Sequence, residues 1–257
     1  MLIYHGIRRY HCKMSGLATI RLNPNAEIQR QRIAEDTFCI IVDNFLEDPD
    51  ALVEFAAKNA EQFSIPERSY PGVMMRLDTD ALLDFDRFIR NRMGKAFSFL
   101  RGNARLSTGL SMVTFKPHEL TNYQRLCHTD PRNDMARRNY AALVYLYADE
   151  ALGGTAFYRY KRPDIIYRAL ELDMQDPKAA AAFLAEHTAV FRQPPRYISE
   201  SNELADLLYI VPPRFNRFVF YSGEIAHSAH ITSPELLTTD FRKGRLTLNC
   251  FASVVPK

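Results

Sequence analysis

The sequence predicts a mainly β protein with flanking helices, built on a jelly roll or a barrel. Three observations support this fold class. From residue 105 the apolar residues follow a period of two, in eight short β-rich runs that brief turns separate. Before residue 100, two stretches follow helical spacing instead. Residues 161–204 interrupt the β-runs and are charged and rich in alanine, which indicates a helical insertion.

Helical support for the β-core is expected over residues 45–100. The first helix follows the β-rich run TFCIIVDNFL, where Asp48 supplies an N-cap and Pro49 takes the first helical position. Apolar residues then recur at near-helical spacing, so that one face of this helix is buried. A second helix is expected from near Asp80 to about Phe99, with Leu82, Phe85, Ile89 and Ala96 on one face.

The β-core is expected over residues 105–255, and 21–257 are expected to form a single domain. Residues 1–20 are expected to be a flexible N-terminal extension. In the insertion, Asp176-Pro177 followed by KAAAAFLAEH predicts a capped helix. Insertions on such scaffolds often cover the mouth of a site. The predicted strands are 106–116, 121–128, 139–148, 154–160, 206–212, 217–222, 226–231 and 244–254.

Composition excludes several classes of protein. The net charge is 33 − 30 = +3 with dispersed charges, so we expect no nucleic-acid partner. No stretch approaches the ~20 apolar residues of a membrane span, and residues 1–13 lack the apolar core of a signal peptide. The isolated thiols at Cys12, Cys39, Cys127 and Cys250 contain no C-x-x-C pair. We therefore expect a cytoplasmic protein.

The first candidate for a functional site is the motif His128-Thr129-Asp130, which lies at the end of a β-run. Two side chains two residues apart on an extended chain point to the same side, so both can reach one metal. The alternative is an ordinary loop aspartate that caps a turn. His227 lies in a later β-run, and two histidines with one aspartate would make the facial triad of non-haem Fe(II) oxygenases. His230 competes with His227, because residues three apart on a strand face opposite sides.

Six segments occur in a fixed order over about residues 37–255. They are IIVDNFLEDPDALVEFA, MVTFKP followed by YQRLCHTDP, AALVYLY, GGTAFYR, NRFVFYSGEIAH and GRLTLNCF. In these segments the chain resembles the Fe(II)/2-oxoglutarate-dependent dioxygenases, and more narrowly their prolyl-4-hydroxylase-like branch. It looks most like an uncharacterised bacterial family assigned to that branch.

The resemblance implies a double-stranded β-helix core and an Fe(II) site made by His128, Asp130 and His227. It selects His227 over His230, because the family's histidine comes eleven residues after the Asn of the Asn-Arg pair. It also implies that Arg245 binds the far carboxylate of 2-oxoglutarate. The expected activity is an O2-consuming hydroxylation of an unactivated C–H bond in a peptide, an amino acid or a small metabolite.

Three further co-substrate contacts follow from the resemblance. Tyr145 matches a tyrosine that contacts the co-substrate in this branch, although a core aromatic is an equal alternative. Lys116 stands where several relatives have another tyrosine, and its ammonium could also meet a carboxylate. Asn249 could touch the co-substrate from the last strand, or could be a buried structural amide.

Two other functions remain open on the sequence. The first is a non-catalytic β-sandwich binding module with a degenerate or structural metal triad. The second is a metal-dependent hydrolase or cupin-like isomerase that uses the same ligands with Zn or Mn. An oxygenase should bind 2-oxoglutarate in an Fe(II)-dependent way, whereas a bare binding module should not. A hydrolase has no use for an arginine aimed at a co-substrate carboxylate, so Arg245 distinguishes an oxygenase from the second alternative. The sequence leaves the substrate and the oligomeric state open.

Overall fold

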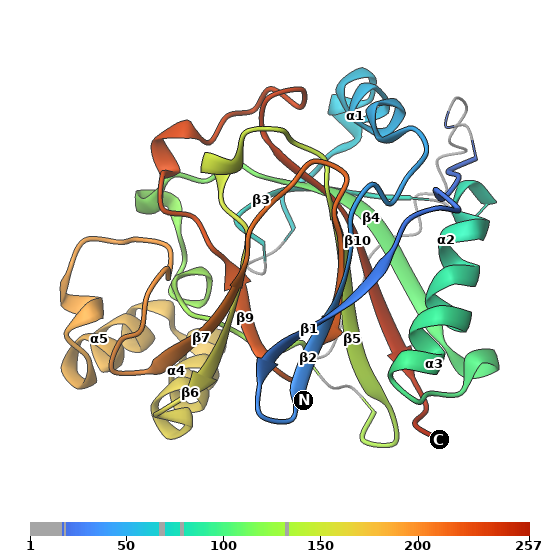
Figure 1. Ribbon diagram of the computed structural model, residues 1–257. Coiled ribbons are helices and arrows are strands. Elements are labelled where there is room, and N and C mark those ends of the chain that lie inside the picture. Colours follow the sequence, from blue (N-terminus) through green and yellow to red (C-terminus); the bar gives the residue numbers. More distant parts are fainter. Residues whose placement is uncertain (1–16, 18, 67–69, 78–79, 132–133) are drawn as a thin grey trace.

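The computed structural model describes residues 17, 19–66, 70–77, 80–131 and 134–257 (Figure 1). Within them, strands form a seven-stranded sheet in the order β1-β2-β8-β5-β10-β4-β3 and a three-stranded sheet in the order β7-β6-β9. All the strand pairs are antiparallel, so a mostly β fold is confirmed. The strands are β1 (Ile28–Ala34), β2 (Thr37–Val42), β3 (Gly72–Arg76), β4 (Arg105–Val113), β5 (Arg138–Tyr145), β6 (Thr155–Tyr160), β7 (Ala205–Val211), β8 (Phe218–Ser222), β9 (Ala226–Ala229) and β10 (Arg245–Val254).

The large sheet has one face against helices and one face toward the small sheet. Strand β10 shows the division, because alternate side chains of a strand point to opposite faces. Leu246 and Leu248 are buried in one core with apolar residues of α1 (Pro49–Lys58) and α2 (Leu83–Phe88). Arg245, Thr247 and Asn249 therefore face the other way. In Figure 1, α2 and α3 (Gly94–Ala96) lie along the flank of the sheet beyond β4.

A second core joins the two sheets. Tyr145 of β5 and Tyr221 of β8 belong to one buried cluster with Phe157 of β6 and Val211 of β7. The rings of Phe157 and Tyr221 meet edge to face with centroids 4.9 Å apart. Polar side chains that point inward from either sheet are consequently enclosed by aromatic residues and held away from water.

The insertion contains two helices, α4 (Pro163–Gln175) and α5 (Pro177–His187), which lie beside the small sheet in Figure 1. The predicted caps are confirmed. The Asp48 carboxylate accepts a hydrogen bond from the backbone N–H of Ala51 at 3.1 Å, and Asp176 accepts one from Lys178 at 2.9 Å. Of the helices in the described part of the chain, none is both long enough and apolar enough to cross a bilayer.

The predicted strand 121–128 is wrong. Thr121 and Gln124 satisfy each other's backbone N–H groups through their side chains, at 3.0 and 3.4 Å, and such local bonds compete with strand pairing. A 3₁₀ turn forms at Tyr123–Arg125, and the chain reaches a β-bridge only at His128. The approach to the His-x-Asp motif is therefore a turn.

The predicted helix 80–99 is broken into shorter pieces. A 3₁₀ turn at Asp80–Leu82 precedes α2, and a π turn at Ile89–Met93 follows it. Leu82, Phe85 and Ile89 are buried as predicted. A π turn holds one residue more than an α turn, so the buried face shifts to Met93, and Ala96 is exposed.

Two strands and one helix were not predicted. Strand β1 is mostly exposed, and β3 is a short edge strand, so neither carries a clear apolar alternation. Helix α4 begins at Pro163 in the charged part of the insertion. Most of the expected extension 1–20 lies outside the described residues, but its end does not. Ile20 is buried in the main core, and its N–H donates to the carbonyl of Ala81.

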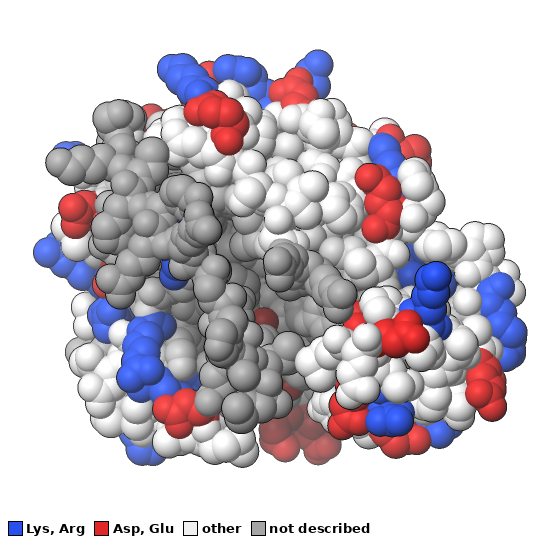
Figure 2. Space-filling view, turned by 180° about the vertical axis from the view of Figure 1, so that it is seen from behind, with Lys and Arg blue, Asp and Glu red and all other residues white. Residues whose placement is uncertain are grey.

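Figure 2 shows the molecule from behind. Among the described residues of this face, basic and acidic side chains are interspersed along the rim. The expected absence of a nucleic-acid partner stays a prediction.

Candidate functional site

Main-chain hydrogen bonds bring three polar residues together at the edge of the small sheet. His128 and His227 of β9 form an antiparallel bridge, with N–H to carbonyl distances of 3.0 and 2.8 Å. Two residues further on, the N–H of Asp130 donates to the carbonyl of Gly223 at 2.8 Å. The His-x-Asp segment is thus fixed at one end against β9 and at the other against the turn between β8 and β9.

This geometry produces a compact donor cluster. One ligand atom from each of His128, Asp130 and His227 lies within 4.8 Å of the others. His227 Nε2 is 3.9 Å from Asp130 Oδ1, and the two imidazole rings have centroids 4.6 Å apart. The side chains of His227 and Asp130 are only 7% and 9% exposed. The structure therefore assembles the three residues that the sequence singled out.

The protonation of the cluster suits a divalent metal. Burial, with a smaller effect of the neighbouring His227, lowers the pKa of His128 to about 3, so its imidazole stays neutral. His227 Nδ1–H donates to the carbonyl of Ile225 at 2.9 Å, which orients the ring so that Nε2 is the nitrogen on the side of Asp130. Burial raises the pKa of Asp130, and its Oδ2 has no hydrogen-bond partner among the described residues. An unpartnered buried carboxylate oxygen beside two imidazoles is the donor set that such a metal requires.

The absence of a side chain at Gly223 makes space for the carboxylate of Asp130. A Cβ built at this glycine would lie 2.2 Å from Asp130 Oδ2 and 2.9 Å from its Cγ. Gly223 thus acts through its lack of a side chain, while its carbonyl holds the backbone of Asp130. Sequence reasoning missed it, since SGE between two β-runs indicates only a turn.

Gly223→Ala should weaken metal binding, because the new methyl displaces the carboxylate of Asp130. We expect about a 10- to 100-fold loss of Fe(II) affinity, the range for losing the support of a metal ligand. A competition titration against a chelating dye measures it. Gly102→Ala is the matched control, because a Cβ there meets nothing within 4 Å. Equal affinity in both variants would contradict the role of Gly223.

Arg245 lies between the two sheets and is only 4% exposed. Its Nε donates to the carbonyl of Gly153 at 3.2 Å, and its Nη2 donates to that of Gly154 at 2.6 Å. Its guanidinium carbon lies 5.7 Å from the ring centroid of Tyr147. No carboxylate of the described residues forms an ion pair with it. A buried guanidinium without a counter-ion is costly, so this site favours an anion.

Four tyrosines surround Arg245, and they differ in what their hydroxyls do. Tyr145 hydrogen-bonds with Thr155 at 2.8 Å, while Tyr147 and Tyr197 donate to backbone carbonyls at 2.5 and 2.7 Å. The buried hydroxyl of Tyr70 makes no hydrogen bond of good geometry among the described residues, and its neighbours are Arg245 and the side chains of Ser111 and Thr247. Sequence reasoning missed Tyr70, because it precedes a strand that was not predicted.

The other predicted co-substrate residues have contacts of their own. Lys116 donates to the carbonyls of Pro234, Glu235 and Leu237 at 3.1, 3.1 and 2.7 Å, which uses all three ammonium protons. Its ammonium is therefore satisfied without a co-substrate.

Tyr145 and Asn249 are better placed. Tyr145 is fully buried and lies among the tyrosines around Arg245. The amide of Asn249 donates to the hydroxyls of Ser111 and Thr247, on the same face of β10 as Arg245. Their contact with a co-substrate stays a prediction.

Comparison with known proteins adds similarities to solved structures and one family. No curated protein matches the chain by sequence. A Pseudomonas putida prolyl-4-hydroxylase is 12% identical with a TM-score of 0.38, and the match covers 81% of this chain and 85% of that one. EvdO2 from Micromonospora carbonacea var. aurantiaca is 10% identical with a TM-score of 0.45, covering 85% and 87%. HygX from Streptomyces hygroscopicus, solved with nickel, 2-oxoglutarate and hygromycin B bound, is 13% identical with a TM-score of 0.40, covering 86% and 83%. A family model matches residues 24–252, which is most of the chain, and the chain therefore belongs to the family of unknown function DUF6445.

Proposed function

We propose that this protein is a non-haem Fe(II), 2-oxoglutarate-dependent oxygenase that hydroxylates an unactivated C–H bond. One observation carries the proposal: a buried His-Asp-His cluster with a bare carboxylate oxygen occurs together with a buried arginine that lacks a counter-ion. The first site fits a divalent metal, and the second fits the far carboxylate of a dicarboxylate co-substrate. The proposed core is a double-stranded β-helix within a single domain, residues 21–257.

The three proposed ligands and Arg245 have different roles in this proposal. His128, Asp130 and His227 hold Fe(II), which with bound 2-oxoglutarate and O2 supplies the oxidising chemistry. Arg245 pairs with the far carboxylate of 2-oxoglutarate and so sets the orientation of the co-substrate between the sheets. The tyrosines around Arg245 exclude water, which strengthens that charge pair. A hydrolase that uses the same metal ligands has no need of a buried, unpaired arginine such as Arg245.

The direct test is an anaerobic titration of the iron-loaded protein with 2-oxoglutarate. We expect a visible metal-to-ligand absorption band that saturates with 2-oxoglutarate and does not appear when Zn replaces iron. Succinate release after O2 is admitted tests turnover, since uncoupled oxidation needs no primary substrate. Iron binding without any 2-oxoglutarate-dependent band would reject the oxygenase and favour a binding module or a hydrolase.

Tyr70 is proposed as an additional hydrogen-bond donor to the co-substrate carboxylate. Tyr70→Phe should weaken 2-oxoglutarate binding about tenfold, the worth of one hydrogen bond to a charged group. It should cost the metal-free protein little stability, because the buried hydroxyl makes no well-formed hydrogen bond with the described residues. Calorimetric titration under nitrogen measures the affinity.

Tyr197→Phe is the matched control for Tyr70→Phe. Its hydroxyl donates to the carbonyl of Phe115 at 2.7 Å, so its loss should lower the unfolding temperature and leave 2-oxoglutarate affinity close to that of the wild type. An unchanged affinity in Tyr70→Phe would remove Tyr70 from the co-substrate site and leave the proposal for Arg245 intact.

The substrate is proposed to be a peptide, an amino acid or a small metabolite, in the cytoplasm. The insertion 161–204 is proposed to select it.

A further inference from the structure

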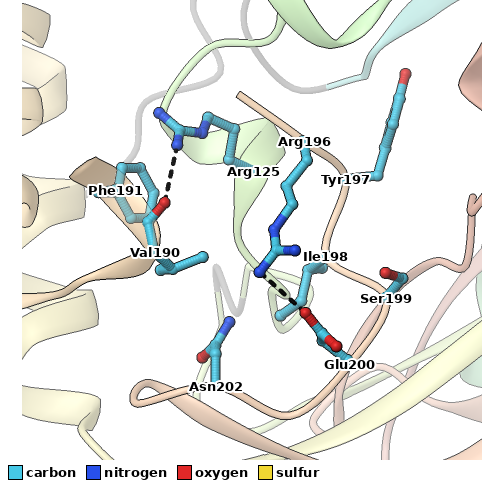
Figure 3. A pocket seen from close by; sticks show the side chains of 9 residues that line it. All are labelled: Arg125, Val190, Phe191, Arg196, Tyr197, Ile198, Ser199, Glu200 and Asn202. Carbon is cyan, nitrogen blue, oxygen red and sulfur yellow. Dashed lines mark hydrogen bonds and ion pairs between the residues drawn. The ribbon is translucent and has the colours of Figure 1, made fainter. Parts of the chain in front are cut away.

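A pocket lies where the insertion meets the turn before His128, and Figure 3 shows its lining. Arg125, from the 3₁₀ turn at Tyr123–Arg125, stands on one side. Arg196, Ser199 and Asn202 line it from the segment that follows the insertion helices. The enclosed volume is about 10 Å³, room for roughly one water molecule, and the pocket opens to solvent, so an oxyanion would bind at its mouth. Its lining includes the donors of Arg125, Arg196 and Asn202 and also one carboxylate, that of Glu200.

Arg125 is held in place but lacks a counter-ion. Its guanidinium carbon stacks 4.1 Å from the ring centroid of Phe191, which fixes the plane of the group and leaves its edges free. Among the described residues its acceptors are the carbonyls of Val190 and Gln193, both at a long 3.4 Å from Nη2. No carboxylate of the described residues pairs with it, whereas Arg162 and Arg242 each have one. Burial, with a smaller effect of Arg196, lowers the pKa of Arg125. An anion bound here would favour the charged guanidinium and so oppose that shift.

Asn202 and Arg196 add further donors. The Asn202 side-chain oxygen accepts the N–H groups of Leu204 and Ala205 at 2.8 and 3.1 Å, so its amide NH2 points toward the pocket (Figure 3). Arg196 pairs with Glu200 at 2.9 Å, with both side chains more than half exposed. Exposed ion pairs are weak, so Arg196 can turn to an incoming anion at little cost.

We propose that this pocket is a binding site for an oxyanion, carried by a carboxylate or a phosphate group. A stacked guanidinium with free edges, a second arginine and an oriented amide together offer the convergent donors that such groups require. The site does not depend on the iron centre. Because Arg125 is three residues before His128, an anion bound here is adjacent to the segment that holds the proposed metal ligands.

The test uses the metal-free full chain and two probes, inorganic phosphate and acetate, each against chloride at equal ionic strength. We expect a saturable rise in unfolding temperature and a measurable calorimetric affinity with at least one probe. A response to phosphate alone assigns a phosphate site, and a response to acetate assigns a carboxylate site. Arg125→Gln should lower the affinity about tenfold or more, the scale of a lost charged hydrogen bond.

Arg168→Gln is the matched control, because this arginine is exposed on α4 and paired with Glu171. It should leave the affinity unchanged. Arg196→Gln is the second test variant and should also weaken binding, and its exposed side chain makes it safe for folding should Arg125→Gln not fold. Absence of a saturable response to either probe, or equal affinity in the wild type and the variants at 125 and 196, overturns the proposal.

Discussion

Asp130→Asn should abolish Fe(II) binding and leave the metal-free protein folded. The carboxylate is buried and carries an oxygen without a hydrogen-bond partner among the described residues, so it gives the apoprotein no stabilising contact through that atom. Replacing it by a neutral amide removes the charge that a divalent metal needs. The free energy of unfolding of the metal-free protein should stay the same or rise by about 1 kcal/mol, because an uncompensated charge leaves the interior. Iron retained after gel filtration measures the first effect and thermal unfolding the second.

His230→Ala is the control for the metal centre. His230 lies on the same segment as His227, but its Nε2 hydrogen-bonds with the carbonyl of Ser199 at 3.1 Å, outside the donor cluster. This variant should keep iron and lose a little stability, whereas His227→Ala should lose iron. Full iron binding by Asp130→Asn, or loss of iron on substitution of His230 alone, would show that the metal site is assigned wrongly.

The His-Asp-His cluster was predictable because much of its information is local. His128 and Asp130 are fixed by a spacing of two residues, and the choice between His227 and His230 follows from strand alternation together with the family resemblance. The structure adds the main-chain hydrogen bonds that join the segment of His128 to the segment of His227. These bonds are long-range, and neither segment carries a sequence pattern that predicts them. The same holds for Gly223, whose importance depends on where Asp130 lies.

The surroundings of Arg245 were harder to predict, because the residues there come from distant parts of the chain. Tyr70 reaches Arg245 through the pairing of β3 with β4, and β3 has too weak a pattern to be identified. The resemblance places Lys116 in the co-substrate site, which stays a prediction, and in the structure its ammonium donates to the carbonyls of Pro234, Glu235 and Leu237. A flexible cation takes whichever acceptors the fold brings near, and sequence spacing does not encode that choice.

Arg245→Leu should weaken 2-oxoglutarate binding by about 2 to 5 kcal/mol, the cost of truncating one partner of a desolvated charge pair. Fe(II) affinity should remain near that of the wild type, because Arg245 contacts none of the three proposed ligands. The variant also leaves the carbonyls of Gly153 and Gly154 without their donor, so some loss of stability is expected. Affinity is therefore measured by anaerobic calorimetry at a temperature where thermal unfolding shows the variant to be folded.

Arg245→Lys separates the charge from the shape of the guanidinium. Lysine keeps a positive charge between the sheets but offers a point donor in place of a planar fork, so it should restore only part of the 2-oxoglutarate affinity. A structural role limited to the two glycine carbonyls predicts a different pattern, in which stability changes in both variants and 2-oxoglutarate affinity in neither. The 2-oxoglutarate affinities of Arg245→Lys and Arg245→Leu thus test whether the co-substrate is the counter-ion of Arg245. A bound carboxylate pairs with both prongs of a guanidinium but with only one point of an ammonium, so its affinity should differ between arginine and lysine.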